Sequence, residues 1–130
     1  MAQHRDPVTA VGAPAAVGPY AHAIRAGGLL FCSGQVALDP ESGDLAAGGH
    51  PEQTVRCLEN LAAVCAAAGA ELRDAVRLTV YVTDMGAFEE VNRAYSGFFS
   101  SDPPARSVVG VTALPRGSLV EIDAIVALPA

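Results

Sequence analysis

A change of hydrophobic period along the chain constrains the fold more than any other feature of the sequence. Residues 51–68 repeat apolar side chains at helical spacing, with Pro51 in the first turn and Gly69 just past the end. Residues 75–82 instead alternate with a period of two, which places four side chains on one face of a strand: Val76, Leu78, Val80 and Val82. The sequence therefore predicts a helix followed directly by a strand.

Further strands and a second helix are predicted on both sides of this pair. In chain order the expected elements are strands at 20–25 and 29–33 joined by Gly27-Gly28, the helix at 51–68, the strand at 75–82, a helix from an N-cap at Asp84 to about Phe99, a strand after Arg106 and a strand at 119–127. Each strand–helix–strand connection favours a right-handed parallel crossover. The order β-β-α-β-α-β-β thus predicts an α+β fold, a mixed sheet with two helices on one face.

The length of the chain bounds the number of domains. Its 130 residues suffice for one hydrophobic core and are too few for two, so a single domain is expected over residues 1–130. Residues 1–15 show no clear period, and we expect poor order there. The second face of the predicted sheet has no helix to cover it. Since 51% of the residues are hydrophobic, we expect another subunit to cover that face.

Composition excludes several classes of function. All eight basic residues are arginines, against fourteen acids, and the net charge of −6 argues against nucleic-acid binding. The lack of lysine removes Schiff-base chemistry and the phosphate-loop lysine. The three histidines have no second ligand at a metal-binding spacing, so no metal site is expected. The three cysteines are an odd set, and Cys57 and Cys65 are interpreted as buried side chains of the first helix.

The chain shows no sign of export or membrane insertion. Its start lacks the basic and apolar regions of a signal peptide, and no apolar run approaches the roughly 18 residues that a membrane span needs. A cytoplasmic protein without membrane partners is expected.

Arg106 is the strongest candidate for a functional side chain. It lies where a loop stiffened by Pro103 and Pro104 becomes an apolar, β-branched strand. A guanidinium held there can bind a carboxylate or phosphate through two parallel hydrogen bonds. A structural ion pair is the ordinary alternative for such an arginine.

Four other positions stand out beside Arg106. Tyr20, the last residue of Gly-Pro-Tyr, opens the first strand, and Ser33-Gly34 ends the second, where glycine lets a ligand approach the backbone. Asn92 lies in the second helix, where asparagine is a poor helix former unless its amide is used. Glu121 shares one face of the last strand with Asp123. Each has an ordinary explanation as well: a packing tyrosine, a turn serine, a surface amide or a solvated acid.

Taken in order, these pieces resemble a known family. Gly-Pro-Tyr at 18–20, Ser-Gly-Gln at 33–35, Pro-Ala-Arg-Ser at 104–107 and Val-Glu-Ile at 120–122 are similar to motifs of the reactive intermediate deaminases, the RidA or YjgF/YER057c/UK114 proteins. The resemblance implies a chorismate-mutase-like subunit in a homotrimer, with ligand sites between subunits and no cofactor. It also implies hydrolysis of amino-acid-derived enamines and imines, such as 2-aminoacrylate and 2-iminopropionate, to 2-oxo acids and ammonia.

The resemblance assigns roles to the candidate residues. Arg106 would hold the substrate carboxylate, and Glu121 would place or activate water. The remaining candidates would line the pocket: Tyr20, Ser33, Gly34 and Asn92. Val108 and Gly110 depart from the family, because members with the typical deaminase site often carry cysteine and glutamate there.

These departures leave substrate identity and catalysis open. One alternative is a non-catalytic trimer that binds small carboxylates as a sensor or chaperone. A second is a ribonuclease or translation inhibitor, against which the acidic balance and missing lysine count. Chorismate mutase activity is disfavoured, because its substrate is a dicarboxylate and the sequence offers only one clear carboxylate-binding arginine.

Overall fold

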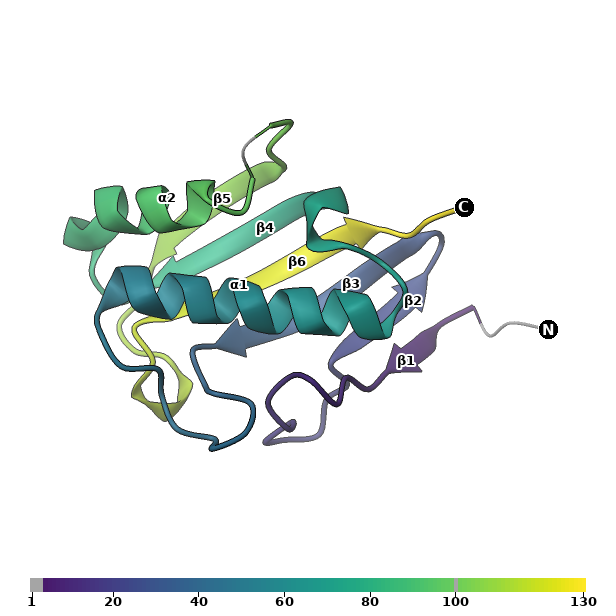
Figure 1. Ribbon diagram of the computed structural model, residues 1–130, viewed down its shortest axis with the longest axis horizontal. Helices are drawn as coiled ribbons and strands as arrows, with labels where there is room; N and C mark the ends of the chain where they lie inside the picture. Colours follow the sequence, from purple (N-terminus) through teal and green to yellow (C-terminus); the bar gives the residue numbers. More distant parts are fainter. Residues whose placement is uncertain (1–3, 100) are drawn as a thin grey trace.

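Six strands form one sheet in the order β1-β2-β3-β6-β4-β5 (Figure 1). The structure is a computed structural model that describes residues 4–99 and 101–130. Only the pairing of β4 with β5 is parallel; the other neighbouring strands are antiparallel. The elements are β1 (Asp6–Val8), β2 (Ala23–Ala26), β3 (Leu29–Val36), α1 (His50–Ala67), β4 (Ala75–Val82), α2 (Phe88–Ser96), β5 (Ala105–Gly110) and β6 (Val120–Ala127), with single 3₁₀ turns η1 (Leu72–Asp74), η2 (Met85–Ala87) and η3 (Pro115–Gly117).

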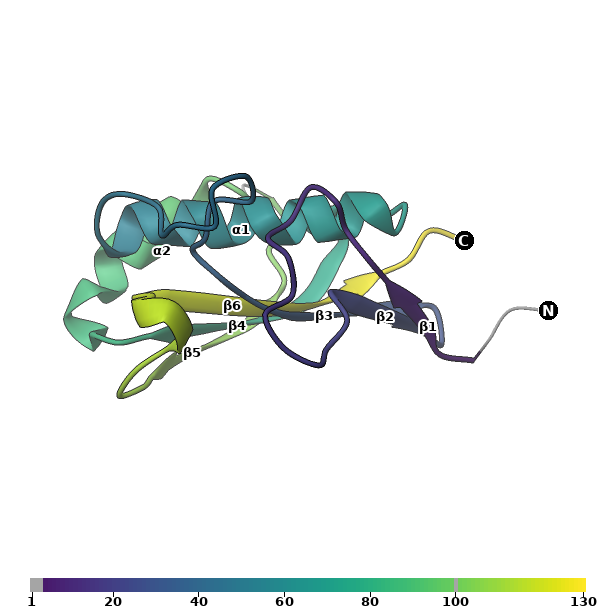
Figure 2. The same cartoon turned by 90° about the horizontal axis from the view of Figure 1, so that it is seen from below.

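Both helices lie on the same face of the sheet, as Figure 2 shows. α1 connects β3 to β4, which are parallel because each is antiparallel to β6 between them. α2 connects β4 to the parallel strand β5. The predicted α+β class and mixed sheet are therefore confirmed, and each helix lies on a crossover between parallel strands.

The core lies between the helices and this face of the sheet. Along β6 buried and partly exposed residues alternate, so Val120 and Ile122 face the helices while Glu121 faces away. Leu58, Leu61 and Val64 form the buried stripe of α1. Val55 and Ala62, which the helical spacing also placed on the apolar face, are partly exposed and lie at its edge. All three cysteines are free and buried, which confirms the interpretation of Cys57 and Cys65.

The N-terminal segment is the largest correction to the expected fold. Apart from residues 1–3, which lie outside the described part of the chain, the segment expected to be poorly ordered is placed. Asp6–Val8 forms β1 against β2, and Val8 and Ala10 are buried in the core. The strand has three residues and contains Pro7, which lacks a backbone donor. Such a short edge strand gives no readable period, and pairing with β2 stabilises it instead.

Several element ends also differ from the expectation. The strand predicted to end at Ser33-Gly34 continues to Val36, because a register shift between Cys32 and Gln35 accommodates extra residues. A second shift between Ala75 and Arg77 turns Val76 outward, so that its side chain is exposed and not buried as predicted. Asp84 caps η2 rather than α2, accepting a hydrogen bond from the Gly86 N–H at 2.8 Å.

The second face of the sheet carries no helix in the described residues (Figure 2). Two large apolar side chains of that face, Phe31 and Val109, are 42% and 40% exposed. The expectation of an uncovered apolar face is therefore confirmed, while the subunit that would cover it stays a prediction. In the described residues, neither helix combines the length and the apolar character that crossing a bilayer requires.

Candidate functional site

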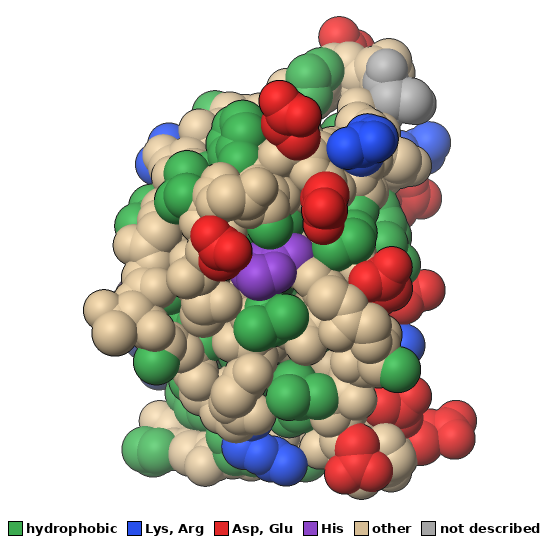
Figure 3. Space-filling view, turned by 90° about the vertical axis from the view of Figure 1, so that its left-hand side faces the viewer, with side chains coloured by type: hydrophobic (Ala, Val, Ile, Leu, Met, Phe, Trp, Pro, Cys, Tyr) green, Lys and Arg blue, Asp and Glu red, His purple; other side chains and the backbone are tan. Residues whose placement is uncertain are grey.

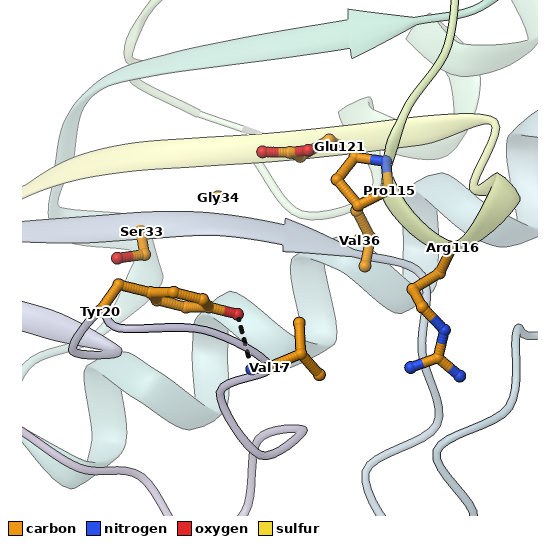
Figure 4. Close-up of a pocket in the computed structure, with 8 residues that line it drawn as sticks. All are labelled: Val17, Tyr20, Ser33, Gly34, Val36, Pro115, Arg116 and Glu121. Carbon is orange, nitrogen blue, oxygen red and sulfur yellow. Dashed lines mark hydrogen bonds between the residues drawn. The ribbon is translucent and has the colours of Figure 1, made fainter.

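A pocket of about 330 Å³ opens where the N-terminal loop, β3, β6 and the turn before β6 meet (Figure 4). We call it the Glu121 pocket. Four of the predicted site residues line it together: Tyr20, Ser33, Gly34 and Glu121. Four further residues complete the lining: Val17, Val36, Pro115 and Arg116. Arg116 and the apolar lining of the pocket were not among the residues predicted from the sequence.

A β-bulge shapes the floor of the pocket. β3 and β6 pair at Cys32 with Ala124 and again at Gln35 with Ile122, so Ser33 and Gly34 together oppose the single residue Asp123. Bulges of this kind redirect side chains and are frequent beside active sites.

Gly34 is needed for the position of Glu121. A Cβ atom built at Gly34 would collide with the Glu121 carboxylate and lie 2.9 Å from its Cδ atom. Hence the acid occupies the space that a side chain at position 34 would fill. Gly34 was predicted to let a ligand approach the backbone. Within the subunit, the group that lies close to the Gly34 backbone is the Glu121 carboxylate.

Glu121 is a partly buried acid with a second acid, Asp123, nearby on the same strand. Partial burial, and secondarily the negative charge of Asp123, raise the pKa of the Glu121 carboxyl above its usual value. Asp123 accepts a hydrogen bond from the Tyr81 hydroxyl at 3.2 Å. Raised carboxyl pKa values bring an acid closer to the range in which it exchanges protons near neutral pH.

Tyr20 and Ser33 are fixed by the backbone around them. The Val17 N–H donates to the Tyr20 hydroxyl at 3.3 Å, the dashed line in Figure 4. The Ser33 hydroxyl donates to the Ala21 carbonyl at 2.6 Å, and the Ser33 N–H donates to the His22 carbonyl at 3.0 Å. The proton of the Ser33 hydroxyl is therefore engaged, and its oxygen can act only as an acceptor towards a further group.

Buried polar side chains of α1 hold the strand ends beside the pocket. The Asn60 amide donates to the carbonyls of Val36 and Leu38, at 3.2 and 2.9 Å. Gln53 Oε1 accepts from the Leu119 N–H at 2.8 Å, just before β6. Sequence analysis missed both residues, although polar side chains at buried helix positions were a usable signal.

Arg106 lies in a second group of residues, which we call the Arg106 cluster. Its Nη1 donates to Asn92 Oδ1 at 2.7 Å. Its guanidinium carbon lies 4.8 Å from the ring centroid of Tyr95 and 5.9 Å from that of Phe88. Among the described residues no carboxylate pairs with Arg106, so the ion-pair alternative is not what the structure contains. The amide and the rings hold the guanidinium in place, and none of these contacts neutralises its positive charge.

The two groups lie on opposite faces of the sheet. Arg106 pairs with the buried Leu78 of β4 and contacts α2, so its side chain is on the helix face. Glu121 pairs with Tyr81 and alternates with buried neighbours, so it is on the uncovered face. Within one chain, Arg106 contacts Asn92, and the four predicted residues of the Glu121 pocket lie together. The two groups are separated by the sheet.

Val108 and Gly110 share the face of Arg106, as strand alternation predicted. They pair with Val80 and Val82 of β4, which are buried under the helices. Val108 packs against the edge of the core. A Cβ atom at Gly110 would lie 3.0 Å from Met85 Cγ, so any side chain there requires Met85 to shift.

The comparisons with known proteins agree with this architecture. Residues 11–128 match the family model named Endoribonuclease L-PSP. The mouse protein named 2-iminobutanoate/2-iminopropanoate deaminase is 44% identical over 93% of this chain and 90% of its own.

Solved structures share the fold over nearly the whole chain. RidA from Psychrobacter is 38% identical with a TM-score of 0.90, over 95% of this chain and 99% of its own. E. coli TdcF with bound serine is 33% identical with a TM-score of 0.90, over 95% and 99%. The chain therefore belongs to the reactive intermediate deaminase family, the RidA or YjgF/YER057c/UK114 proteins.

Proposed function

We propose that this protein hydrolyses reactive imines and enamines derived from amino acids, giving 2-oxo acids and ammonia. The observation that carries the proposal is the pair of complementary groups. A carboxyl with a raised pKa lies in a half-open pocket, and a cation without an ion pair among the described residues is held on an amide and two rings. A 2-imino acid has matching parts: a carboxylate for the cation and an electrophilic carbon for water. The deaminase name of the mouse relative supports the same reaction.

We further propose that the complete site forms between two copies of the chain in a homotrimer. Arg106 and Glu121 lie on opposite faces of one sheet, so one small substrate cannot contact both within a single subunit. A second copy packed against the uncovered sheet face would bring its Arg106 cluster to the Glu121 pocket. The exposed Phe31 and Val109 on that face support such a packing.

The proposed reaction needs no covalent attachment to the protein. Arg106 binds the substrate carboxylate in a bidentate manner. Glu121 accepts a proton from water as the water oxygen attacks the carbon of the protonated imine. In the resulting carbinolamine the hydroxyl proton moves to nitrogen, and the C–N bond breaks with its electron pair leaving on nitrogen. Ammonia departs from the 2-oxo acid and takes up the proton that Glu121 had accepted, which restores the carboxylate. Ser33 and Tyr20 fix the orientation, and holding reactants in attack geometry supplies several kcal/mol, by an order-of-magnitude estimate.

Binding without turnover is the second candidate. The structure of TdcF with bound serine supports it, because serine carries a carboxylate and no imine. RNA as the substrate has less support, since the chain carries a net charge of −6. In Figure 3 acidic side chains outnumber basic ones and gather over the right-hand and upper parts of the face turned to the viewer.

One assay separates these candidates. An amino-acid oxidase generates imines from alanine, methionine or leucine, and semicarbazide traps them as semicarbazones. A deaminase competes with the trap, so adding the protein lowers the initial rate of semicarbazone formation, and Arg106→Ala does not. Serine binding in calorimetry without an effect on any imine would leave a binding protein and overturn the deaminase proposal.

A further inference from the structure

A buried histidine beside the Glu121 pocket has no part in the proposed reaction. His22 lies between Tyr20 and β2 and is 6% exposed. Both of its ring nitrogens bind the backbone of the N-terminal loop. Nδ1 accepts from the Ala10 N–H at 2.9 Å, and Nε2 is 2.8 Å from the Pro14 carbonyl oxygen.

These contacts define the protonation of the ring. Because the Ala10 N–H is a donor, Nδ1 carries a lone pair and no proton. The ring proton is therefore on Nε2, where it donates to the Pro14 carbonyl. Only the neutral imidazole makes both bonds, since a ring protonated on both nitrogens has no acceptor left.

The loop that His22 binds continues into the pocket wall. It runs from β1 past Ala10 and Pro14 to Val17, which lines the Glu121 pocket. At that end the Val17 N–H donates to the Tyr20 hydroxyl. The loop is thus tied to the His22 ring near its start and to Tyr20 near its end. The His22 backbone also accepts from the Ser33 N–H, so one residue contacts both sides of the pocket.

We propose that His22 is a positioning residue that sets the substrate affinity of the Glu121 pocket by holding the loop of residues 10–17. It does so through its two side-chain hydrogen bonds. Glu121 lies on β6 and does not depend on this loop, so the loss of His22 weakens substrate binding more than it slows the chemical step. The kinetic part of this proposal rests on the proposed deaminase function; the structural part does not.

Two substitutions separate hydrogen bonding from packing. His22→Gln supplies one acceptor and one donor, and so can bind both the Ala10 N–H and the Pro14 carbonyl. His22→Phe keeps a ring and loses both bonds. His4→Phe, at an exposed histidine ahead of β1, is the matched control for removing an imidazole.

The structural test needs no substrate. Amide exchange of Ala10 and the NMR chemical shifts of Val17 and Tyr20 are measured in all four proteins, with thermal unfolding to confirm that each is folded. His22→Phe is expected to speed Ala10 exchange by about tenfold and to move the Val17 and Tyr20 resonances. His22→Gln and His4→Phe are expected to resemble the wild type. Unchanged Ala10 exchange in His22→Phe, or equal effects of Phe and Gln, would overturn the proposal.

The kinetic test uses the imine of methionine. His22→Phe is expected to raise KM by about tenfold with kcat within about twofold of wild type, and His22→Gln is expected to restore most of the affinity. A fall in kcat at unchanged KM would overturn the positioning role. If the wild type shows no imine hydrolysis, the deaminase proposal fails, while Ala10 exchange still supports or overturns the structural role of His22.

Discussion

The Glu121 pocket and the Arg106 cluster hold their charged groups by different means. The pocket depends on backbone: a β-bulge, a glycine and a loop create space around a partly buried acid. The cluster depends on side chains, since an amide and two aromatic rings fix the guanidinium at the edge strand β5. The acid has room beside it for water and substrate. The arginine, by contrast, is held in one orientation.

This difference suits the two groups to different tasks in one reaction. An acid that accepts a proton needs space for the water it activates, whereas an arginine that anchors a carboxylate needs a fixed geometry. Since they lie on opposite faces of one sheet, the comparison predicts that each is half of a site completed by another subunit.

The largest effect is expected at the anchoring half. Arg106→Ala should lower kcat/KM for imine hydrolysis by about 10²- to 10³-fold, because the substrate carboxylate loses its charged partner. Arg106→Lys should recover little, since a single ammonium cannot form the two parallel bonds. Steady-state kinetics give the ratio, and circular dichroism confirms the fold. Near-normal turnover by Arg106→Ala would break the assignment.

A somewhat smaller loss is expected at the acid. Glu121→Gln keeps the size of the side chain and removes the proton acceptor, so kcat should fall about 10²-fold while KM changes little. A change confined to KM would instead make Glu121 a binding or structural residue.

The two variants together test whether one site uses two chains. Mixed trimers of Arg106→Ala and Glu121→Gln should regain activity, because a site between subunits can combine the intact half of each variant. With random mixing, roughly a quarter of the sites would be complete. The measurement is activity after mixing the unfolded variants and refolding them, with each variant refolded alone as the control. No gain in trimers shown by native mass spectrometry to be mixed would contradict a shared site, and a stable, active monomer would exclude it.

The pH dependence of kcat tests the ionisation of Glu121 in the pocket. Glu121 must be ionised to accept a proton, and its raised pKa means that kcat should fall as the pH drops through a range above that of an ordinary glutamate. Asp123→Asn removes the second cause of the raised pKa, so the acid limb of the profile should move to lower pH. If the acid limb of the Asp123→Asn profile stays where it is in the wild type, burial alone raises the pKa of Glu121.

The smallest effect is expected beside Arg106, in selectivity. Val108 gives that face an apolar, branched side chain, so imines of leucine and methionine should be handled at least as well as those of serine and alanine. Val108→Cys should shift the ratios of kcat/KM by about two- to fivefold towards the smaller imines. A strong preference for the smallest imine, with no shift in Val108→Cys, would place Val108 outside the substrate cleft.

Most of the fold was predictable because helices and strands differ in hydrophobic period. The strand at 75–82 was found with its bounds, and α1 to within one residue at each end. The edge strand β1 and the register of the strands were not predicted. Neither the bulge at Ser33-Gly34 nor the one at Val76 alters the local pattern, because a bulge exists only relative to the partner strand.

The sequence predicted one set of site residues, whereas the structure places them in two separate groups. Along β5 both faces carry apolar residues, with Val108 on one and Val109 on the other, so the period of two does not tell which face Arg106 shares. The rings beneath its guanidinium belong to Phe88 and Tyr95 of α2, whose helical spacing indicates an apolar face, and only the tertiary contact shows that they also hold Arg106.

The contact between Gly34 and Glu121 has a consequence for anyone who redesigns this pocket. Because the carboxylate occupies the volume of the missing Cβ, the two positions form one design variable. A side chain added at 34 requires the Glu121 carboxylate to move, or a shorter residue at 121, and either change displaces the acid from its present position. A library that varies both positions together can also exchange the acid on β6 for a functional group on β3.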